Sequence, residues 1–359
     1  MSAIKVAKFN FPRKHQYFCR PDATTMADIR SSRRTIEAIV NGDKKGLARA
    51  ISQIENHFTQ QWDFAVKIGL ERQSSYVIGI TGSSGVGKST IIAEIIKNIR
   101  QNNFIGRIGV LSIDPTSPYS GGAFLGDRIR MTDLLLDENV FIRSMATRGA
   151  TGGVTGSVLQ VLNLIQCWAG KDGVVFFETV GAGQSETTIS DIADTIVLVI
   201  NPDSGDDIQA NKAGIAEIGD IFVISKGDSP GSERQRLYWE QARDLSVSHT
   251  ADAWIPPILI VEAATSRNID HIMEAVRSHQ AWLVKNNRYH QRRIRQARFE
   301  LITTVEARFR QILRQNVSET LLDHLAEQIY SGKIDSSSAV SEILKLMQVP
   351  TNQMSKKMD

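Results

Sequence analysis

A glycine-rich segment between Gly82 and Ser89 contains residues that are suited to phosphate chemistry. It reads GSSGVGKS, follows the apolar run 76–81 and precedes a helical pattern. Glycines let backbone N–H groups converge on a phosphate, and the N-terminus of the next helix adds partial positive charge. Lys88 would reach the β- and γ-phosphates, and the Ser89 hydroxyl would hold Mg²⁺. The pattern predicts a nucleotide site formed by Gly82, Ser83, Ser84, Gly85, Val86, Gly87, Lys88, Ser89 and Thr90.

A second loop contains residues that could select the base. The apolar run 221–225 ends at Ser225 and is followed by Lys226 and Asp228. Guanine-specific proteins carry the motif Asn-Lys-x-Asp at this place. A carboxylate there accepts hydrogen bonds from guanine N1–H and the 2-amino group together, which adenine cannot offer. Lys226 would pack along the base. Ser225 lacks the reach and the amide of asparagine, so the loop is expected to prefer guanine but to bind the nucleotide more weakly. A polar turn after a strand is the alternative. A further base-contacting loop is expected after the last strand, at Glu262 and Ala263, where it would place a backbone N–H.

Three acidic residues lie at or just beyond the ends of apolar runs. Asp114, Asp127 and Glu178 would gather near Lys88 and Ser89, because the carboxyl ends of parallel strands share one edge of a sheet. Glu178 takes the place of a Walker B aspartate and would bind or orient Mg²⁺. Asp127 would complete the metal shell and Asp114 would position water. The alternative for each is a helix cap or an exposed turn acid.

Short apolar runs alternate with helical patterns through the middle of the chain. The runs lack the alternation of half-exposed strands, which is typical of buried parallel strands. The strands are expected at 76–81, 108–114, 140–144, 174–178, 195–200, 221–225 and 258–261, with helices near 90–102, 155–169, 207–217, 232–245 and 268–286. This pattern predicts an α/β fold, a doubly wound and mostly parallel sheet of the P-loop type.

The chain divides into three predicted regions. Residues 1–72 form an N-terminal extension and a helical cap, whose apolar spacing predicts a helical hairpin broken at 41–43. Residues 73–286 form the P-loop G domain. Residues 287–359 form a C-terminal helical region, with a long amphipathic helix and shorter helices near 318–330 and 337–348.

Composition and charge exclude several classes of protein. A hydrophobic content of 42% with 23% charged residues excludes a disordered chain. Cys19 and Cys167 form no CxxC pair, so a disulfide framework and a cysteine metal site are excluded and a reducing compartment, the cytoplasm, is favoured. No stretch approaches 18 apolar residues, so no membrane span is expected.

The basic excess of the chain lies in one helix. Residues 288–314 hold eight arginines against Glu300 and Glu306, and the rest of the chain is net acidic. We expect the arginines to lie on a solvated face, with an apolar stripe that packs in a homodimer. Binding of these arginines to RNA or an anionic membrane is the alternative. The stripe consists of Ile294, Leu301, Val305, Phe309 and Ile312.

Several sequence blocks together resemble the MeaB/ArgK family, GTPases that accompany adenosylcobalamin-dependent methylmalonyl-CoA mutase. The blocks are DPTSP at 114–118, GGAFLGDRIRM at 121–131, MATRG at 145–149, ETVGAGQSE at 178–186, GDDIQ at 205–209 and GLARAI at 46–51. The likeness runs from about residue 33 to about residue 300. The chain departs from the family at Ser225, at Ala150-Thr151 and in its N-terminal extension.

The resemblance implies a GTPase that binds GTP, GDP and Mg²⁺ and acts as a nucleotide-switched chaperone. Its partner would be a cobalamin-dependent acyl-CoA mutase, and it would be a homodimer that binds neither nucleic acid nor membrane. Gly181 and Gly183 resemble a switch loop, and Asp206, Asp207 and Lys212 resemble a mobile loop that faces the partner.

Two other functions stay open at this point. The first is a nucleotide-dependent kinase of a basic amino-acid transport system, which is an older interpretation of ArgK-type sequences. No residue of the sequence indicates a site that would accept the phosphate. The second is a nucleic-acid or membrane-binding module that uses the arginine-rich tail.

Overall fold

The computed structural model describes residues 34–56, 75–102, 104, 106–114, 131–146, 156–179, 188–203, 218–246 and 252–346. Within these residues, seven strands form one sheet in the order β3-β2-β4-β1-β5-β6-β7, and every neighbouring pair is parallel. The predicted doubly wound α/β fold is therefore confirmed. The strands are β1 (Tyr76–Thr81), β2 (Ile108–Asp114), β3 (Val140–Ala146), β4 (Val174–Thr179), β5 (Thr195–Ile200), β6 (Ile221–Ile224) and β7 (Ile258–Ile260).

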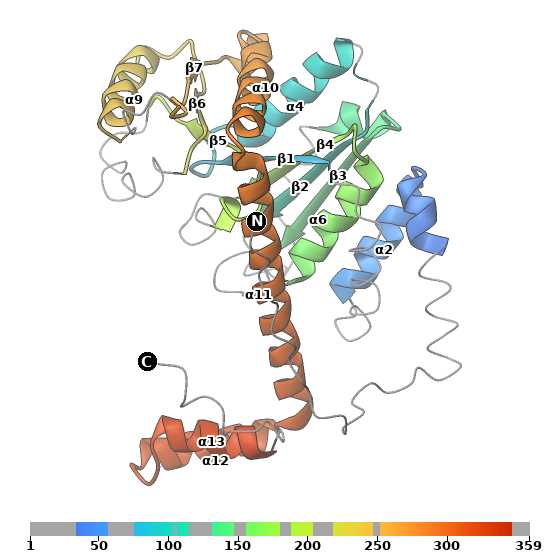
Figure 1. Cartoon of the computed structure of the whole chain (residues 1–359), viewed down its shortest axis with the longest axis vertical. Helices are drawn as coiled ribbons and strands as arrows, with labels where there is room; N and C mark the ends of the chain where they lie inside the picture. Colours follow the sequence, from blue (N-terminus) through green and yellow to red (C-terminus); the bar gives the residue numbers. More distant parts are fainter. Residues whose placement is uncertain are drawn as a thin grey trace, which may run out of the picture.

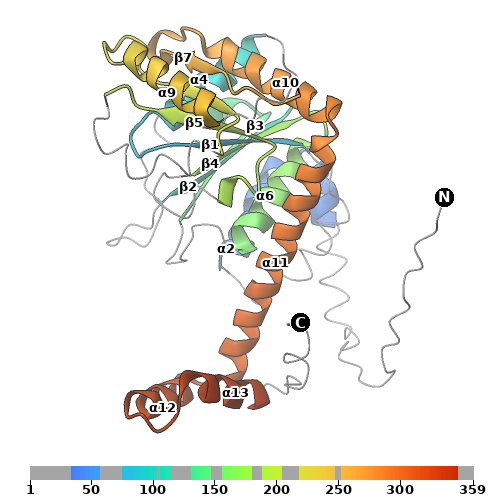
Figure 2. The ribbon, with the colours of Figure 1, turned by 60° about the vertical axis from the view of Figure 1, so that its left-hand side comes forward.

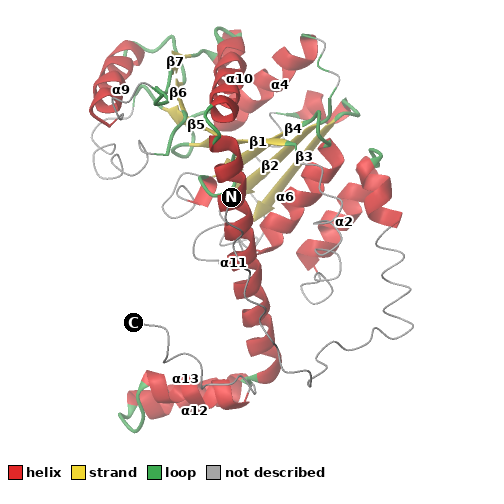
Figure 3. Cartoon of the chain, viewed as in Figure 1, coloured by secondary structure: helices red, strands yellow, loops and turns green. Residues whose placement is uncertain are grey.

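Helices cover both faces of the sheet (Figure 1; helices are red in Figure 3). On one face lie α4 (Lys88–Gln101) and α10 (Ile269–Lys285), and on the other lie α6 (Gly156–Ala169), α2 (Lys44–Asn56) and, near β6 and β7, α9 (Ser232–Ser246). β4 and β5 are buried along their whole length because both faces are covered, which explains their unbroken apolar runs. The predicted helix near 207–217 lies outside the described residues.

The N-terminal cap is a helical hairpin, as its sequence predicts. Residues 34–40 are helical, a turn follows, and α2 begins at Lys44. Asp43 caps α2 by accepting a hydrogen bond of 2.8 Å from the backbone N–H of Gly46. The turn is held on the G domain, since the Trp168 indole donates to the Gly42 carbonyl.

The C-terminal region forms an arm. α11 (Arg288–Asn316) runs away from the sheet and ends at a hairpin of α12 (Glu319–Tyr330) and α13 (Ser336–Leu346), which stands apart from the sheet in both views (Figures 1 and 2). The apolar stripe of α11 is exposed in the single chain: Leu301 is 63% exposed and Val305 58%. None of the described helices is both long and apolar enough to cross a membrane.

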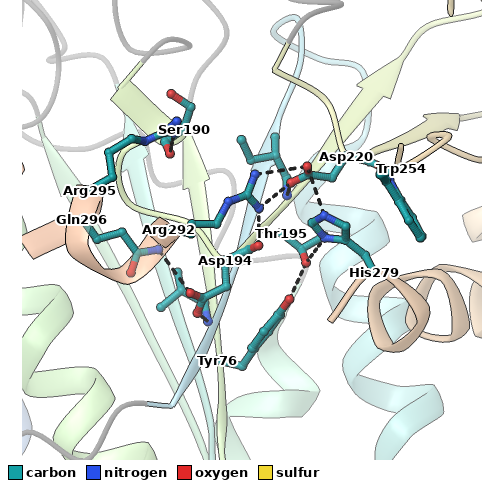
Figure 4. A network of polar contacts seen from close by, with 12 residues as sticks. Tyr76, Ser190, Asp194, Thr195, Asp220, Trp254, His279, Arg292, Arg295 and Gln296 are labelled. Carbon is teal, nitrogen blue, oxygen red and sulfur yellow. Dashed lines mark hydrogen bonds and ion pairs between the residues drawn. The ribbon is translucent and has the colours of Figure 1, made fainter. Parts of the chain in front are cut away.

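The first turns of α11 correct one expectation, because two of its arginines are ion-paired and only 17% and 18% exposed rather than solvated. Arg293 Nη2 lies 2.9 Å from Oδ2 of Asp194, and both terminal nitrogens of Arg292 contact the Asp220 carboxylate at 2.9 and 3.2 Å. The reason is that Asp194 and Asp220 stand immediately before β5 and β6, and buried carboxylates need such partners. Figure 4 shows the contacts of Arg292 with Asp220.

A histidine from α10 joins the same network (Figure 4). His279 Nδ1 lies 2.8 Å from Oγ1 of Thr195, and its Nε2 lies 3.3 Å from Oδ1 of Asp220. Burial lowers the pKa of His279 to about 4, so the ring is neutral at pH 7. The arm is thus fixed to the sheet at the amino ends of the strands, opposite the phosphate loop, which follows the carboxyl end of β1. We call this network, formed by Asp194, Asp220, His279, Arg292 and Arg293, the arm joint.

Candidate functional site

The glycine-rich loop lies between β1 and α4, the context that its motif requires. Gly82 has φ of 140° and approaches β5 so closely that an added Cβ would lie 2.2 Å from the Val199 carbonyl oxygen. Gly87 has φ of 98° and is the N-cap of α4, whose first turn contains no acidic residue. Only glycine suits both positions, and the helix N-terminus presents its N–H groups and partial positive charge to an anion.

Lys88 lies over this loop. Its side chain is buried, and its Nζ donates hydrogen bonds to the carbonyls of Gly82 and Ser83 at 2.8 and 2.9 Å. The ammonium is therefore held close to the loop backbone, where a phosphate group would enter. This position fits the predicted contact with the β- and γ-phosphates.

Ser89 and Glu178 meet at the carboxyl edge of the sheet. The Ser89 hydroxyl donates a 2.7 Å hydrogen bond to Oε1 of Glu178, and both side chains are buried. In this bond the Ser89 hydroxyl is the donor and the Glu178 carboxylate is the acceptor. Oxygen ligands of this kind suit Mg²⁺, which binds few protein groups and retains water and phosphate ligands. No cluster of three or more His, Cys, Asp or Glu is found among the described residues, which do not include Asp127.

The side chains of two predicted acids lie outside the described residues. Asp114 ends β2, whose carboxyl end belongs to the same sheet edge, but its side chain lies outside the described residues. Asp127 and the glycines of the predicted switch, Gly181 and Gly183, also lie outside them. Their roles stay predictions.

Two adjoining loops form the predicted base region. The backbone N–H of Gly227 donates to the Val261 carbonyl at 2.9 Å, so the loop of Lys226 and Asp228 lies against the segment of Glu262 and Ala263. Asp228 is exposed, as a carboxylate that accepts from a base must be. The two loops therefore adjoin, and base contact by these residues stays a prediction.

Ser225 is buried at the start of this loop. Its hydroxyl and its backbone N–H both donate to the Ile200 carbonyl, at 3.1 and 2.9 Å. The loop is therefore fixed to the end of β5. Since the preceding residue Val199 faces Gly82, β5 connects the phosphate loop and the base loop along one edge.

Sequence reasoning missed one residue of this edge. Ser112 of β2 is buried, and its hydroxyl donates to Oε2 of Glu178 at 2.9 Å. The available signal was a polar residue inside an otherwise apolar strand, two positions before Asp114.

Comparison of the chain with known proteins identifies the family to which it belongs. The family described as methylmalonyl-CoA mutase-associated GTPase MeaB matches residues 47–318. The chain belongs to the MeaB family of GTPases. This MeaB-family protein is 37% identical, over 86% of its length and 95% of the relative's, to a protein of Pyrococcus abyssi that is named as a GTPase.

A second relative is the methylmalonic aciduria type A homolog, mitochondrial, of Mus musculus. It is 32% identical over 69% of this MeaB-family chain and 62% of its own length. Among solved structures, a LAO/AO transport system kinase superposes with a TM-score of 0.62 at 22% identity, over 90% of this chain and 98% of that one. The structural match supports the P-loop fold.

Proposed function

We propose that this MeaB-family GTPase is a nucleotide-switched chaperone for an adenosylcobalamin-dependent acyl-CoA mutase, such as methylmalonyl-CoA mutase. The observation that carries the proposal is the family match over 47–318, which includes the edge where Lys88, Ser89 and Glu178 meet. The mouse relative, named for methylmalonic aciduria, supports the same class of partner. GTP would be hydrolysed to GDP and phosphate, and the nucleotide state would be reported to the mutase.

The residues at the edge would each contribute one element of catalysis. Lys88 would bind the β- and γ-phosphates and offset their charge, and Ser89 with Glu178 would hold Mg²⁺. The metal, when bound, would neutralise charge on the phosphate oxygens. Asp127 would complete the metal shell and Asp114 would position water. Catalysis would come mainly from positioning and electrostatic stabilisation, and turnover without a partner would be slow.

Base selection would belong to the loop of Ser225, Lys226 and Asp228. The exposed Asp228 carboxylate supports a preference for guanine, because it can accept two hydrogen bonds from that base alone. The Ser225 hydroxyl is already bonded to the Ile200 carbonyl, which supports a weaker hold on the nucleotide than an asparagine would give.

The remaining assignments are also proposals. We infer three regions, 1–72, 73–286 and 287–359, a cytoplasmic location, and a homodimer formed through the exposed stripe of α11. The stripe supports dimerisation because a soluble monomer rarely leaves so many aligned apolar side chains in water.

The alternatives are less well supported. A kinase would need an acceptor site. The transport-system kinase shares the fold at only 22% identity, and a shared fold does not imply a shared activity. A nucleic-acid or membrane module would use the arginines of α11, yet Arg292 and Arg293 are engaged in the arm joint.

Phosphate release from GTP, measured with and without a purified cobalamin-dependent acyl-CoA mutase, tests the proposal. We expect the mutase to accelerate hydrolysis. A double variant, Asp207→Ala with Lys212→Ala, should retain the basal rate and lose the acceleration, because these residues belong to the predicted partner loop. A double variant that responds like the wild type would remove this loop from the mechanism. No response to any such mutase would overturn the partner assignment.

A further inference from the structure

Ser112 occupies an unusual place for a hydroxyl. It lies in β2, in register with Ser144 of β3 on one side and Glu178 of β4 on the other. The preceding residues of β2 on the same face, Ile108 and Val110, are fully buried and apolar. A hydroxyl at 2% exposure is unfavourable unless it is hydrogen-bonded, and the partner of Ser112 is the Glu178 carboxylate.

Glu178 is thereby bonded from two elements. The hydroxyl of Ser89, from α4, donates to Oε1 at 2.7 Å, and that of Ser112, from β2, donates to Oε2 at 2.9 Å. The terminal torsion of a glutamate has broad, shallow preferences, so one donor alone leaves the carboxylate plane poorly defined. Two donors, one on each oxygen, fix both the plane and the oxygen that faces Ser89.

We propose that Ser112 is a positioning residue for the magnesium site. By holding Oε2, it turns Oε1 toward Ser89 and so orients the two side chains that would hold Mg²⁺. This inference rests on the proposed roles of Ser89 and Glu178 in metal binding. Ser112 itself touches neither the metal nor the nucleotide in this arrangement.

The test measures magnesium binding rather than turnover. A fluorescent GDP is titrated into the full chain in EDTA and over a range of Mg²⁺ concentrations. Ser112→Ala should leave the affinity in EDTA unchanged and raise the Mg²⁺ concentration for half-maximal tightening by about tenfold, the usual size of an outer-shell effect. Ser112→Thr retains the hydroxyl and should restore most of the magnesium response.

Ser144→Ala is the matched control. Ser144 is a buried serine of the neighbouring strand in the same register row, and the described residues include no hydrogen bond between it and Glu178. It should titrate like the wild type. Should Ser112→Ala fail to fold, Ser112→Cys, of similar size but with a weak donor, must show the shift.

Two results would overturn the inference by itself: an unchanged magnesium response in Ser112→Ala, or an equal shift in Ser144→Ala. If the GDP affinity of the wild-type protein does not depend on Mg²⁺, the metal assignment of Ser89 and Glu178 fails as well. The wild-type titration therefore separates failure of the proposed site from failure of the role of Ser112.

Discussion

Nη2 of Arg293 lies 2.9 Å from Oδ2 of Asp194, a carboxylate with no exposed surface just before β5. Burial raises the pKa of Asp194, while Arg293, the backbone N–H of Val77 and the Gln296 amide all act in the opposite direction by stabilising the charge. These directed contacts fix the position of the first turns of α11 on the sheet. The direction of the arm depends on them.

Removing Arg293 should therefore destabilise the protein strongly. Arg293→Met leaves the Asp194 carboxylate buried without its cation, which should cost about 3–5 kcal/mol in the free energy of unfolding. The control is Arg295→Met, which removes a more exposed pair with Asp191 and should cost at most about 1 kcal/mol. Urea denaturation measures both. Equal losses in the two variants would show that the buried pair is not a principal anchor of the arm.

His279 should make stability depend on pH. Burial, the largest cause, lowers its pKa to about 4 from 6.5, with Asp220 opposing the shift and Arg292 adding to it. Between these values the unfolded chain binds a proton that the folded chain does not, so stability falls as pH falls. The expected loss from this residue between pH 7 and pH 5 is about 2 kcal/mol.

Comparing variants isolates this contribution. His279→Gln should lose less stability than the wild type over the same pH interval, measured by denaturant titration at pH 7 and pH 5. His324→Gln, which alters an exposed histidine of α12, should keep the wild-type dependence. A His279→Gln protein with the wild-type pH dependence would contradict the assignment.

Base preference should depend on Asp228. The wild type should bind GDP more tightly than ADP, and Asp228→Asn should lose that preference because one of its paired acceptors becomes a donor. Ser225→Asn should tighten GDP binding, whereas Ser229→Asn, in the same loop but bonded to Asp203, should not. Titration calorimetry measures each affinity. Equal wild-type affinities for GDP and ADP would overturn guanine specificity.

The sequence predicted the sheet because the signals that mark its strands are local. Apolar runs bounded by turn residues locate buried parallel strands, and the phosphate loop needs a strand before it and a helix after it. Parallel pairing then brings Ser89 and Glu178 to one edge, although they are 89 positions apart.

The parts that escaped prediction depend on tertiary packing. Helical spacing shows which residues of α11 share a face, but not that Arg292 and Arg293 meet Asp220 and Asp194, which are 72 and 99 positions away. Likewise, a single polar residue in a strand does not identify its partner, so Ser112 was overlooked. The roles of Asp127, Gly181 and Gly183 stay predictions.

The exposed stripe of α11 should mediate self-association. We expect light scattering at micromolar concentration to give twice the chain mass of 39.8 kDa. Replacing Leu301 and Val305 together by glutamate should give a monomer, because charges would enter the buried interface. Leu245→Glu, at an apolar side chain of α9 that is 90% exposed, is the control and should remain dimeric. A wild-type mass near 40 kDa would contradict dimerisation through the arm.

The measurement that tests the account most directly is GTP hydrolysis by the wild type and by Lys88→Ala. Lys88 is buried over the phosphate loop, and no other lysine or arginine among the described residues is placed by a hydrogen bond to this loop. The wild type should release phosphate slowly, and the variant should release none and bind nucleotide at least about tenfold more weakly, roughly 1.4 kcal/mol. Undiminished turnover in Lys88→Ala would contradict the assignment of this edge as the GTPase site.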